Sequence, residues 1–215
     1  MPDTSRPHHH GNLRDALIDA GLALLREGGT GALTLRRAAS RAGVSHAAPA
    51  HHFDGLRGLL TAIATRAFGD FTAAMQAARA RAEPTAFGGV LGICTGYMDY
   101  AEQNSGLFHL IFVSSEVDRA DPALRAAADA AYGTLRAACL PFSADGQPDK
   151  MTEAAVWSLV HGFTLLRLNS RETMAGRPDF SLLLQRVLPK NAQPPLPLSE
   201  SCAISPPRSA GVAQG

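Results

Sequence analysis

The chain has 215 residues, of which 46% are hydrophobic and 18% are charged, and its formal net charge is +1. This length and hydrophobic content are sufficient for a buried core in one or two domains, and they exclude an intrinsically disordered chain. Residues 1–82 hold 10 Lys and Arg against 6 Asp and Glu, whereas residues 83–215 hold 10 against 13. The more basic first part is typical of a segment that faces nucleic acid.

The cysteines and the hydropathy pattern bear on disulfides, metal sites, membrane spans and localisation. Cys94, Cys139 and Cys202 are odd in number and widely spaced, so they predict neither a disulfide framework nor a structural metal. The longest apolar run, residues 156–168, is interrupted by polar side chains and is too short to span a bilayer. No apolar segment of a secretory signal follows the first charged residues, and we therefore expect a cytoplasmic chain without a membrane partner.

The N-terminal residues 1–11 are polar and proline-rich, and a mobile arm is expected there. Its triplet His8–His10 could be a metal-binding tract, but a flexible basic arm is the more ordinary interpretation. Apolar residues at helical spacing then predict a helix from Asn12, as the N-cap, to Glu27, which ends at the following pair of glycines.

Residues 34–53 contain two short helix-like runs joined by a tight turn. Thr34 is predicted as the hydroxyl N-cap of the first run, in which apolar residues recur at helical spacing. Gly43 supplies a stop with positive φ, and Ser45 is predicted as the N-cap of the second run. Two helices joined by a glycine-containing turn form a helix-turn-helix, whose second helix can lie in the major groove of DNA.

A long helix is predicted from Asp54, as its N-cap, to about Arg81. Roughly 27 residues at 1.5 Å each span about 40 Å, which is long enough to connect the N-terminal segment to a separate body. Pro84 ends this helix, because proline cannot continue it and restrains the preceding residue.

The remaining residues keep a helical period, and no segment shows sustained strand alternation. A loop is expected at 142–150 and a disordered, proline-rich tail from residue 189. The predicted helices cover residues 85–102, 107–114, 121–140, 152–169 and 179–187.

The predicted helix at 153–169 is the most apolar of the chain. Its polar residues Ser158, His161, Thr164 and Arg167 are three apart and occupy a narrow stripe, so most of its circumference is expected to be buried. One body can cover one side of such a helix, and a second subunit would cover the other. The sequence therefore predicts a homodimer that forms through this helix, with the 179–187 helix beside it.

The helix-turn-helix resembles that of the TetR family of bacterial transcriptional regulators, whose motif reads roughly Thr-aliphatic-Arg-x-x-Ala-x-x-Ala-Gly-Val-Ser and ends in His-Phe. The chain departs at Pro49, Ala50 and Leu56, where an aliphatic residue, a phosphate-contacting Tyr and a Lys are common. The sequence Trp157-x-x-x-His161-Gly162 also looks like the signature of one TetR subgroup's C-terminal domain. The motif is matched in register at Thr34, Leu35, Arg36, Ala39, Ala42, Gly43, Val44, Ser45, His52 and Phe53.

The resemblance implies an all-α fold of about nine helices. It places a three-helix DNA-binding domain with the helix-turn-helix at residues 10–70 and a helical effector-binding and dimerisation domain at 71–190. A disordered tail follows at 191–215.

The first turn of the first motif helix contains Arg36 and Arg37. This helix crosses the DNA backbone in a helix-turn-helix, so phosphate contacts are expected from both arginines, the alternative being an ordinary solvated helix surface. Between Arg41 and Arg57 there is no Lys or Arg, and three histidines occupy the interval. The predicted DNA-binding residues are Thr34, Arg36, Arg37, Ser45, His46, Ala47, His51 and His52.

A pocket for a small-molecule effector in the body is a further implication of the resemblance. The plain alternative is that its candidate residues are core, because aromatic and Met side chains at helical spacing usually are. The candidates are Tyr97, Met98, Phe108, Phe112, Trp157, His161 and Phe163.

Catalytic motifs are absent from the sequence. There is no phosphate-binding glycine loop, no GxSxG or HExxH motif and no useful carboxylate pair, so neither an enzyme nor a cofactor or metal site is predicted. The predicted function is a ligand-responsive repressor that binds a palindromic double-stranded operator as a homodimer and releases it when the effector binds. A sequence-blind helical DNA-binding or scaffold protein without an effector is the alternative, and an enzyme with an appended helix-turn-helix comes third.

Overall fold

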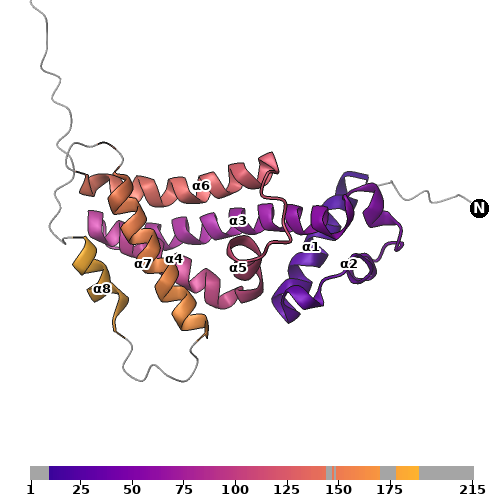
Figure 1. The fold of residues 1–215 in the computed structure, drawn as a ribbon, viewed down its shortest axis with the longest axis horizontal. Coiled ribbons are helices and arrows are strands. Elements are labelled where there is room, and N and C mark those ends of the chain that lie inside the picture. Colours follow the sequence, from indigo (N-terminus) through magenta and orange to yellow (C-terminus); the bar gives the residue numbers. More distant parts are fainter. Residues whose placement is uncertain (1–9, 144–146, 148, 170–177, 189–215) are drawn as a thin grey trace, which may run out of the picture.

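The structure is a computed structural model that describes residues 10–143, 147, 149–169 and 178–188. These residues form eight α-helices and three short 3-10 helices and contain no strand, so the predicted all-α fold is confirmed (Figure 1). The α-helices are α1 (His10–Gly28), α2 (Leu35–Arg41), α3 (Gly55–Arg81), α4 (Ala86–Gln103), α5 (Ser105–Phe112), α6 (Pro122–Cys139), α7 (Lys150–Asn169) and α8 (Phe180–Val187). The 3-10 helices are η1 (Thr30–Ala32), η2 (Ala48–His51) and η3 (Leu140–Phe142). The predicted N-terminal arm, with His8 and His9, and the tail at 191–215 lie outside the described residues.

The molecule has a head, residues 10–54, at one end and a body built around α3. Helix α3 starts at the head and runs the length of the body, with α4 and α6 packed along it (Figure 1). Helix α7 packs against α4, and α8 packs against α7 at the end farthest from the head. The short α5 contacts both α1 and α3, so head and body share one hydrophobic core.

Three helices start with a side-chain cap, and one of these caps, Thr34, was predicted. The side chains of Thr34, Asp121 and Asp179 accept a main-chain N–H at the start of α2, α6 and α8, at 3.1, 2.9 and 2.8 Å. Asp54 also stands at the N-cap of α3, but its side chain makes no capping bond, so the predicted cap is wrong. Helix α1 begins at His10 and already includes Asn12, its predicted N-cap.

The second element of the helix-turn-helix is shorter than predicted. The sequence predicts a helix capped by Ser45, but the chain forms only η2, whose N-cap Ala47 makes no side-chain bond. Pro49 is the physical reason: in an α-helix that begins after Ser45, it would lack the N–H that bonds the Ser45 carbonyl, and its ring would clash with that carbonyl. A short 3-10 turn with proline near its start avoids both problems. The predicted count of about nine helices thus becomes eight α-helices and three 3-10 helices within the described residues.

Two glycines allow α4 to approach α3 closely. A Cβ at Gly96 would lie 2.6 Å from the carbonyl oxygen of Ala74, and a Cβ at Gly92 would lie 2.9 Å from the Cα of Arg79. Both distances are too short for real atoms, so only glycine fits at these positions. Apolar residues at helical spacing form the inner face of α3 and pack in the same core: Leu60, Ile63, Ala67, Phe71, Met75 and Ala78 are buried, and Leu56 is half-buried.

The faces of α7 differ from the prediction. Thr164 belongs to the predicted polar stripe but is fully buried, because its hydroxyl donates to the Val160 carbonyl at 2.7 Å and needs no water. Trp157 and Leu166 are exposed instead. The single chain therefore leaves apolar surface uncovered on this helix.

Candidate DNA-binding surface and ligand cavity

The first turn of α2 presents two arginines to solvent. Arg36 and Arg37 are exposed, and within the described part of the chain the structure gives neither of them an ion pair. Arg41, at the other end of α2, is different: its Nη1 and Nη2 donate to Oε2 and Oε1 of Glu27, both at 2.6 Å. Two of the three arginines thus remain available for an external anion, while the third joins α2 to α1.

The turn between α2 and η2 carries most of the other predicted DNA-binding residues. Gly43 has a φ of 71°, as predicted, and reverses the chain after α2. Ser45, His46 and Ala47 follow it and are exposed, as is His51 in η2. His52 is half-buried and its ring centroid lies 6.5 Å from that of Phe53, so it packs on the head as well as facing solvent.

Buried residues hold η2 on the head. Ala48, Pro49 and Phe53 are all buried, and the Phe53 N–H donates to the Pro49 carbonyl at 2.9 Å. The guanidinium of Arg14 in α1 lies over the Phe53 ring at 5.4 Å, a cation–π contact. This contact of Arg14 could not be predicted from the sequence, because nothing in the local pattern links Arg14 to a ring so far along the chain.

An apolar cavity of about 220 Å³, partly open to solvent, lies in the body between its helices. Side chains from α3, α4, α6 and α7 and from the end of α5 form its wall, and most of them are aromatic or aliphatic. The lining residues are Phe68, Phe71, Met75, Ile93, Cys94, Tyr97, Ile111, Phe112, Arg119, Ala128, Ala131, Tyr132, Leu135, Trp157 and Val160.

Three of the seven predicted effector residues, Tyr97, Phe112 and Trp157, line this cavity. The other four, Phe108, His161, Met98 and Phe163, are outside its lining. Phe108 is buried behind Tyr97 and Phe112, with ring centroids at 5.7 and 4.8 Å. His161 contacts the same aromatic cluster, whereas Met98 and Phe163 lie beside Arg167 at a separate open groove.

The hydroxyl of Tyr97 joins the cavity wall to His161. Tyr97 Oη lies 2.6 Å from His161 Nδ1. A neutral imidazole accepts at one ring nitrogen, so we assign Tyr97 as the donor to His161 Nδ1. Burial raises the pKa of Tyr97 and lowers the pKa of His161, so both groups are held neutral, in agreement with this assignment.

A second hydrogen-bonded pair joins Tyr132, a half-buried residue of the cavity lining, to the buried Glu153. The Tyr132 hydroxyl donates to Glu153 Oε2 at 2.6 Å, and Glu153 is only 2% exposed. This hydrogen bond is the main reason that the pKa of Tyr132 is raised to about 12. The Tyr132 ring also packs on Trp157, with centroids 5.3 Å apart. The sequence analysis missed this pair, because the two residues lie on different predicted helices.

Arg119 adds a charge to the rim of the cavity. It belongs to the α5–α6 loop, residues 113–121, and donates from Nη1 to the Ile111 carbonyl at 2.7 Å and from Nη2 to the Ser114 carbonyl at 3.1 Å. Because Arg119 lies in a loop, no helical pattern in the sequence indicated that it lines a cavity. These two bonds fix the guanidinium against the end of α5.

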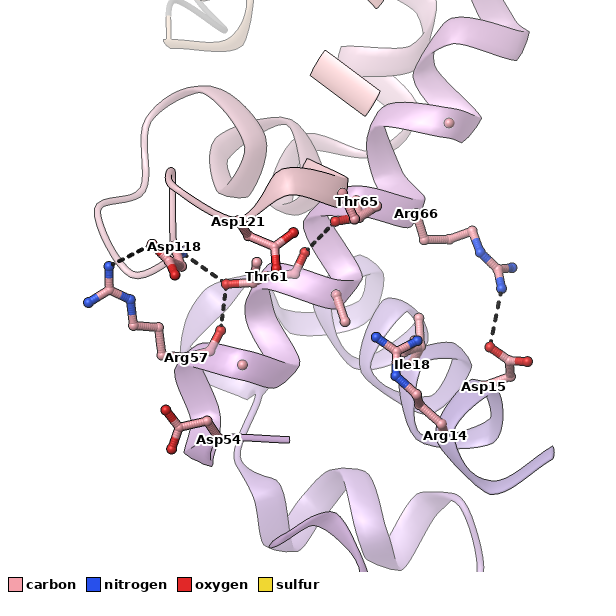
Figure 2. Close-up of a pocket in the computed structure, with 14 residues that line it drawn as sticks. Arg14, Asp15, Ile18, Asp54, Arg57, Thr61, Thr65, Arg66, Asp118 and Asp121 are labelled. Atoms are coloured by element: carbon pink, nitrogen blue, oxygen red, sulfur yellow. Dashed lines mark hydrogen bonds and ion pairs between the residues drawn. The ribbon is translucent and has the colours of Figure 1, made fainter. Parts of the chain in front are cut away.

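The same loop contacts α3 at the junction of head and body (Figure 2). Here a polar groove of about 530 Å³ lies between α1, α3 and the loop. The Asp118 N–H donates to Thr61 Oγ1 at 2.9 Å, and the Asp118 carboxylate pairs with Arg57 at 3.4 Å. Across the groove, Arg66 of α3 pairs with Asp15 of α1 at 3.8 Å. The α5–α6 loop therefore touches both the cavity, through Arg119, and the first turns of α3, through Asp118.

Across the described ranges, no three His, Cys, Asp or Glu side chains are grouped as metal ligands. None of the helices in those ranges combines the length and apolarity needed to cross a bilayer. Cys94 and Cys139 are free and buried, as small core residues.

Two family descriptions match this chain, one over the head and the start of α3 and the other over most of the body. Residues 17–63 match the family described as bacterial regulatory proteins, tetR family, and residues 90–188 match one described as tetracyclin repressor-like, C-terminal domain. An uncharacterized HTH-type transcriptional regulator of Mycobacterium tuberculosis is 26% identical over 158 residues, which is 72% of this chain and 70% of that protein. A solved structure from Rhodococcus sp. RHA1, a protein with unknown function, is 28% identical and covers 88% of this chain and 100% of its own, with a TM-score of 0.71. The multidrug binding protein EbrR, solved in complex with imidazole, shares the fold at 20% identity, over 82% of this chain and 94% of its own, with a TM-score of 0.57.

Proposed function

The chain belongs to the TetR family of bacterial transcriptional regulators, and we propose that it is a ligand-responsive repressor that binds a palindromic operator as a homodimer. Its helix-turn-helix makes it a DNA-binding regulator of transcription. Ligand response, dimer formation and operator symmetry are the proposed parts.

DNA contact is proposed for the exposed residues of α2 and η2. Arg36 and Arg37 supply charge that no carboxylate of the described residues neutralises, so they are suited to phosphate contacts. Ser45, His46 and Ala47 directly precede η2, the element proposed to enter the major groove, where hydroxyl, imidazole and methyl groups reach base edges. Thr34, His51 and His52 are proposed as flanking contacts to the sugar-phosphate backbone.

The position of the α5–α6 loop is the main support for a response to ligand. One residue of this loop, Arg119, lines the cavity, and its neighbour Asp118 is bonded to Thr61 and Arg57 at the start of α3. A ligand that displaces the loop would therefore displace the helix that carries the head. Because two half-sites lie about 34–36 Å apart, a small change in the head positions breaks simultaneous binding.

A homodimer is proposed through α7 and α8. Large apolar side chains are exposed there: Met151 is 79% exposed, Leu166 57% and Leu182 59%. A second copy that covers these residues would remove them from water. The proposed boundary between the DNA-binding domain, 10–70, and the effector and dimerisation domain, 71–190, falls within α3.

Sedimentation tests the dimer directly. The wild type should sediment near twice its chain mass of 22.6 kDa at micromolar concentration. Leu166→Glu and Leu182→Glu should yield monomers, because each would bury a charge in the interface. Val113→Glu is the matched control, since Val113 is 52% exposed but lies at the end of α5. Monomeric wild-type protein that binds operator with full affinity would contradict the dimer.

Selection of operators from random duplex DNA tests the function as a whole. A regulator should enrich a near-palindromic sequence, and footprinting should show two half-sites about one helical turn apart. Enrichment of no sequence, with affinity that depends only on duplex length, would instead support the sequence-blind DNA-binding alternative.

A further inference from the structure

We propose that the cavity binds a small carboxylic acid with an aromatic or compact aliphatic body, and that Arg119 binds its carboxylate. This inference rests on the proposed function, because it names the class of effector. It follows from the size of the cavity, the sign of the charge on its wall and the free donors of one side chain.

The size of the cavity suits a ligand of about one ring and a short substituent. A cavity of about 150 Å³ is sufficient for benzene, and this one measures about 220 Å³. Aromatic rings from three helices, Phe71, Tyr97 and Trp157, form much of the wall, so a flat apolar body is well accommodated.

The wall carries one formal charge, and it is positive. Among the lining residues Arg119 alone is ionised at neutral pH, and no Asp or Glu lines the cavity. Burial raises the pKa of the Cys94 thiol and of the Tyr97 hydroxyl, so both remain neutral. An anionic group on the ligand is therefore attracted to this wall, and a cationic group is repelled.

Arg119 has donors to spare. Its guanidinium carries five N–H groups, and the structure assigns one each from Nη1 and Nη2 to the carbonyls of Ile111 and Ser114. The described residues give it no ion pair. Two neighbouring carboxylates are committed elsewhere, since Asp118 pairs with Arg57 and Asp121 caps α6. Glu116 is exposed to solvent.

The competing possibility is a cationic ligand held by Glu153. This carboxylate is buried behind Tyr132, accepts the Tyr132 hydroxyl and is outside the cavity lining. A cation would have to displace that hydrogen bond and would meet Arg119 in the same small space. These contacts favour a carboxylic acid as the ligand, and the experiment below also tests for a cation.

Three probes with one skeleton separate these possibilities: 3-phenylpropionate, 3-phenylpropanol and 3-phenylpropylammonium. They differ only in whether the head group is an anion, a neutral hydroxyl or a cation. Trp157 is the sole tryptophan of the chain and lines the cavity, so its fluorescence reports binding at this site without DNA. We expect the acid to bind about ten- to a hundred-fold more tightly than the alcohol, and the ammonium to bind most weakly.

Variants assign the effect to Arg119. Arg119→Gln should reduce the affinity for the acid to that for the alcohol and leave the alcohol's affinity unchanged, which also shows that the cavity is intact. Arg119→Lys should retain part of the preference for the acid, because it keeps the charge but loses the fork of donors. Arg125→Gln, which removes an exposed charge on α6 outside the cavity, is the matched control and should bind all three probes as the wild type does.

Each failure has a distinct meaning. Equal affinities for acid and alcohol, or no change in Trp157 fluorescence with any probe at millimolar concentration, would overturn the carboxylic acid class. Tightest binding of the ammonium, lost in Glu153→Gln, would overturn it in favour of a cation site. Operator selection tests the proposed regulator separately: sequence-specific DNA binding without acid binding refutes only the ligand class. Acid binding without any effect on operator affinity refutes only the ligand response.

Discussion

The hydroxyl of Thr61 joins two segments of the protein: it accepts the N–H of Asp118 at 2.9 Å and donates to the Arg57 carbonyl at 2.8 Å (Figure 2). Thr61 is only 5% exposed, so water cannot easily replace either bond. One buried hydroxyl therefore connects the α5–α6 loop to the first turns of α3, next to the head.

Thr61→Val keeps the side-chain shape and removes the acceptor for the Asp118 N–H. The loss of a buried hydrogen bond should lower the free energy of unfolding by about 1–3 kcal/mol. Hydrogen exchange of the Asp118 amide should also accelerate, because the group loses its partner. Thr65→Val is the matched control: Thr65 lies one turn later and its hydroxyl donates within α3, to the Thr61 carbonyl. Equal exchange at Asp118 in both variants would contradict the connection.

Arg36 and Arg37 should set part of the salt dependence of DNA binding. Each phosphate contact contributes about 0.9 to the slope of log K against log salt concentration, so Arg36→Gln and Arg37→Gln should each reduce the slope by about that amount per bound subunit. Arg41→Gln should leave the slope unchanged, because Arg41 is paired with Glu27. Titration of one 30-base-pair duplex (a length of about three helical turns) at several salt concentrations measures all three.

Tyr132 and Glu153 should be energetically coupled. Tyr132→Phe keeps the ring on Trp157 but leaves the buried Glu153 without the hydroxyl proton, and we expect a loss of about 1.5–3 kcal/mol in unfolding free energy. In a Glu153→Leu background, the same change should cost less than about 1 kcal/mol, because no carboxylate then needs the hydroxyl. Urea denaturation of the four proteins of this cycle gives the coupling energy. Additive losses would mean that the hydroxyl stabilises the fold through another contact.

His161 should make the protein less stable in mild acid. Burial lowers the pKa of His161 in the folded chain below its ordinary value of about 6.5, so below about pH 6.5 the unfolded chain binds more protons than the folded one. The free energy of unfolding should therefore fall as the pH falls from 7 to 5. His161→Gln retains an acceptor for Tyr97 and cannot be protonated, so it should remove this part of the pH dependence. Above pH 7 the two stability curves should be parallel, and parallel curves down to pH 5 would contradict the prediction.

Much of the fold could be predicted from local pattern. Helix α4 was expected at 85–102 and runs from Ala86 to Gln103, because capping and apolar spacing act over a few residues. The extent of η2 differs from the prediction because Pro49 lacks the N–H that an α-helix starting after Ser45 would need. Membership of the subgroup with Trp157-x-x-x-His161-Gly162 stays a prediction.

The candidate cavity was less predictable than the fold. Aromatic residues on α4, α5 and α7 were expected to include ligand contacts, but periodicity cannot say which ring faces a void and which faces another ring. Phe108 and Phe112 are one turn apart on α5, yet only Phe112 lines the cavity. Arg119 and Tyr132 were missed because their roles arise from the packing of distant segments.

The contact of α4 with α3 at Gly92 and Gly96 determines where the protein can bend. Main-chain atoms there are so close that sliding or rotating one helix on the other would make atoms overlap. We therefore expect α3 and α4 to behave as one stiff unit, with native-state hydrogen exchange slowest along their shared face. Adaptation to a ligand would then be confined to parts that lack such close main-chain packing, namely the α5–α6 loop and the open side of α7. A methyl group added by Gly96→Ala should disturb the whole unit, including the direction in which its end presents the head.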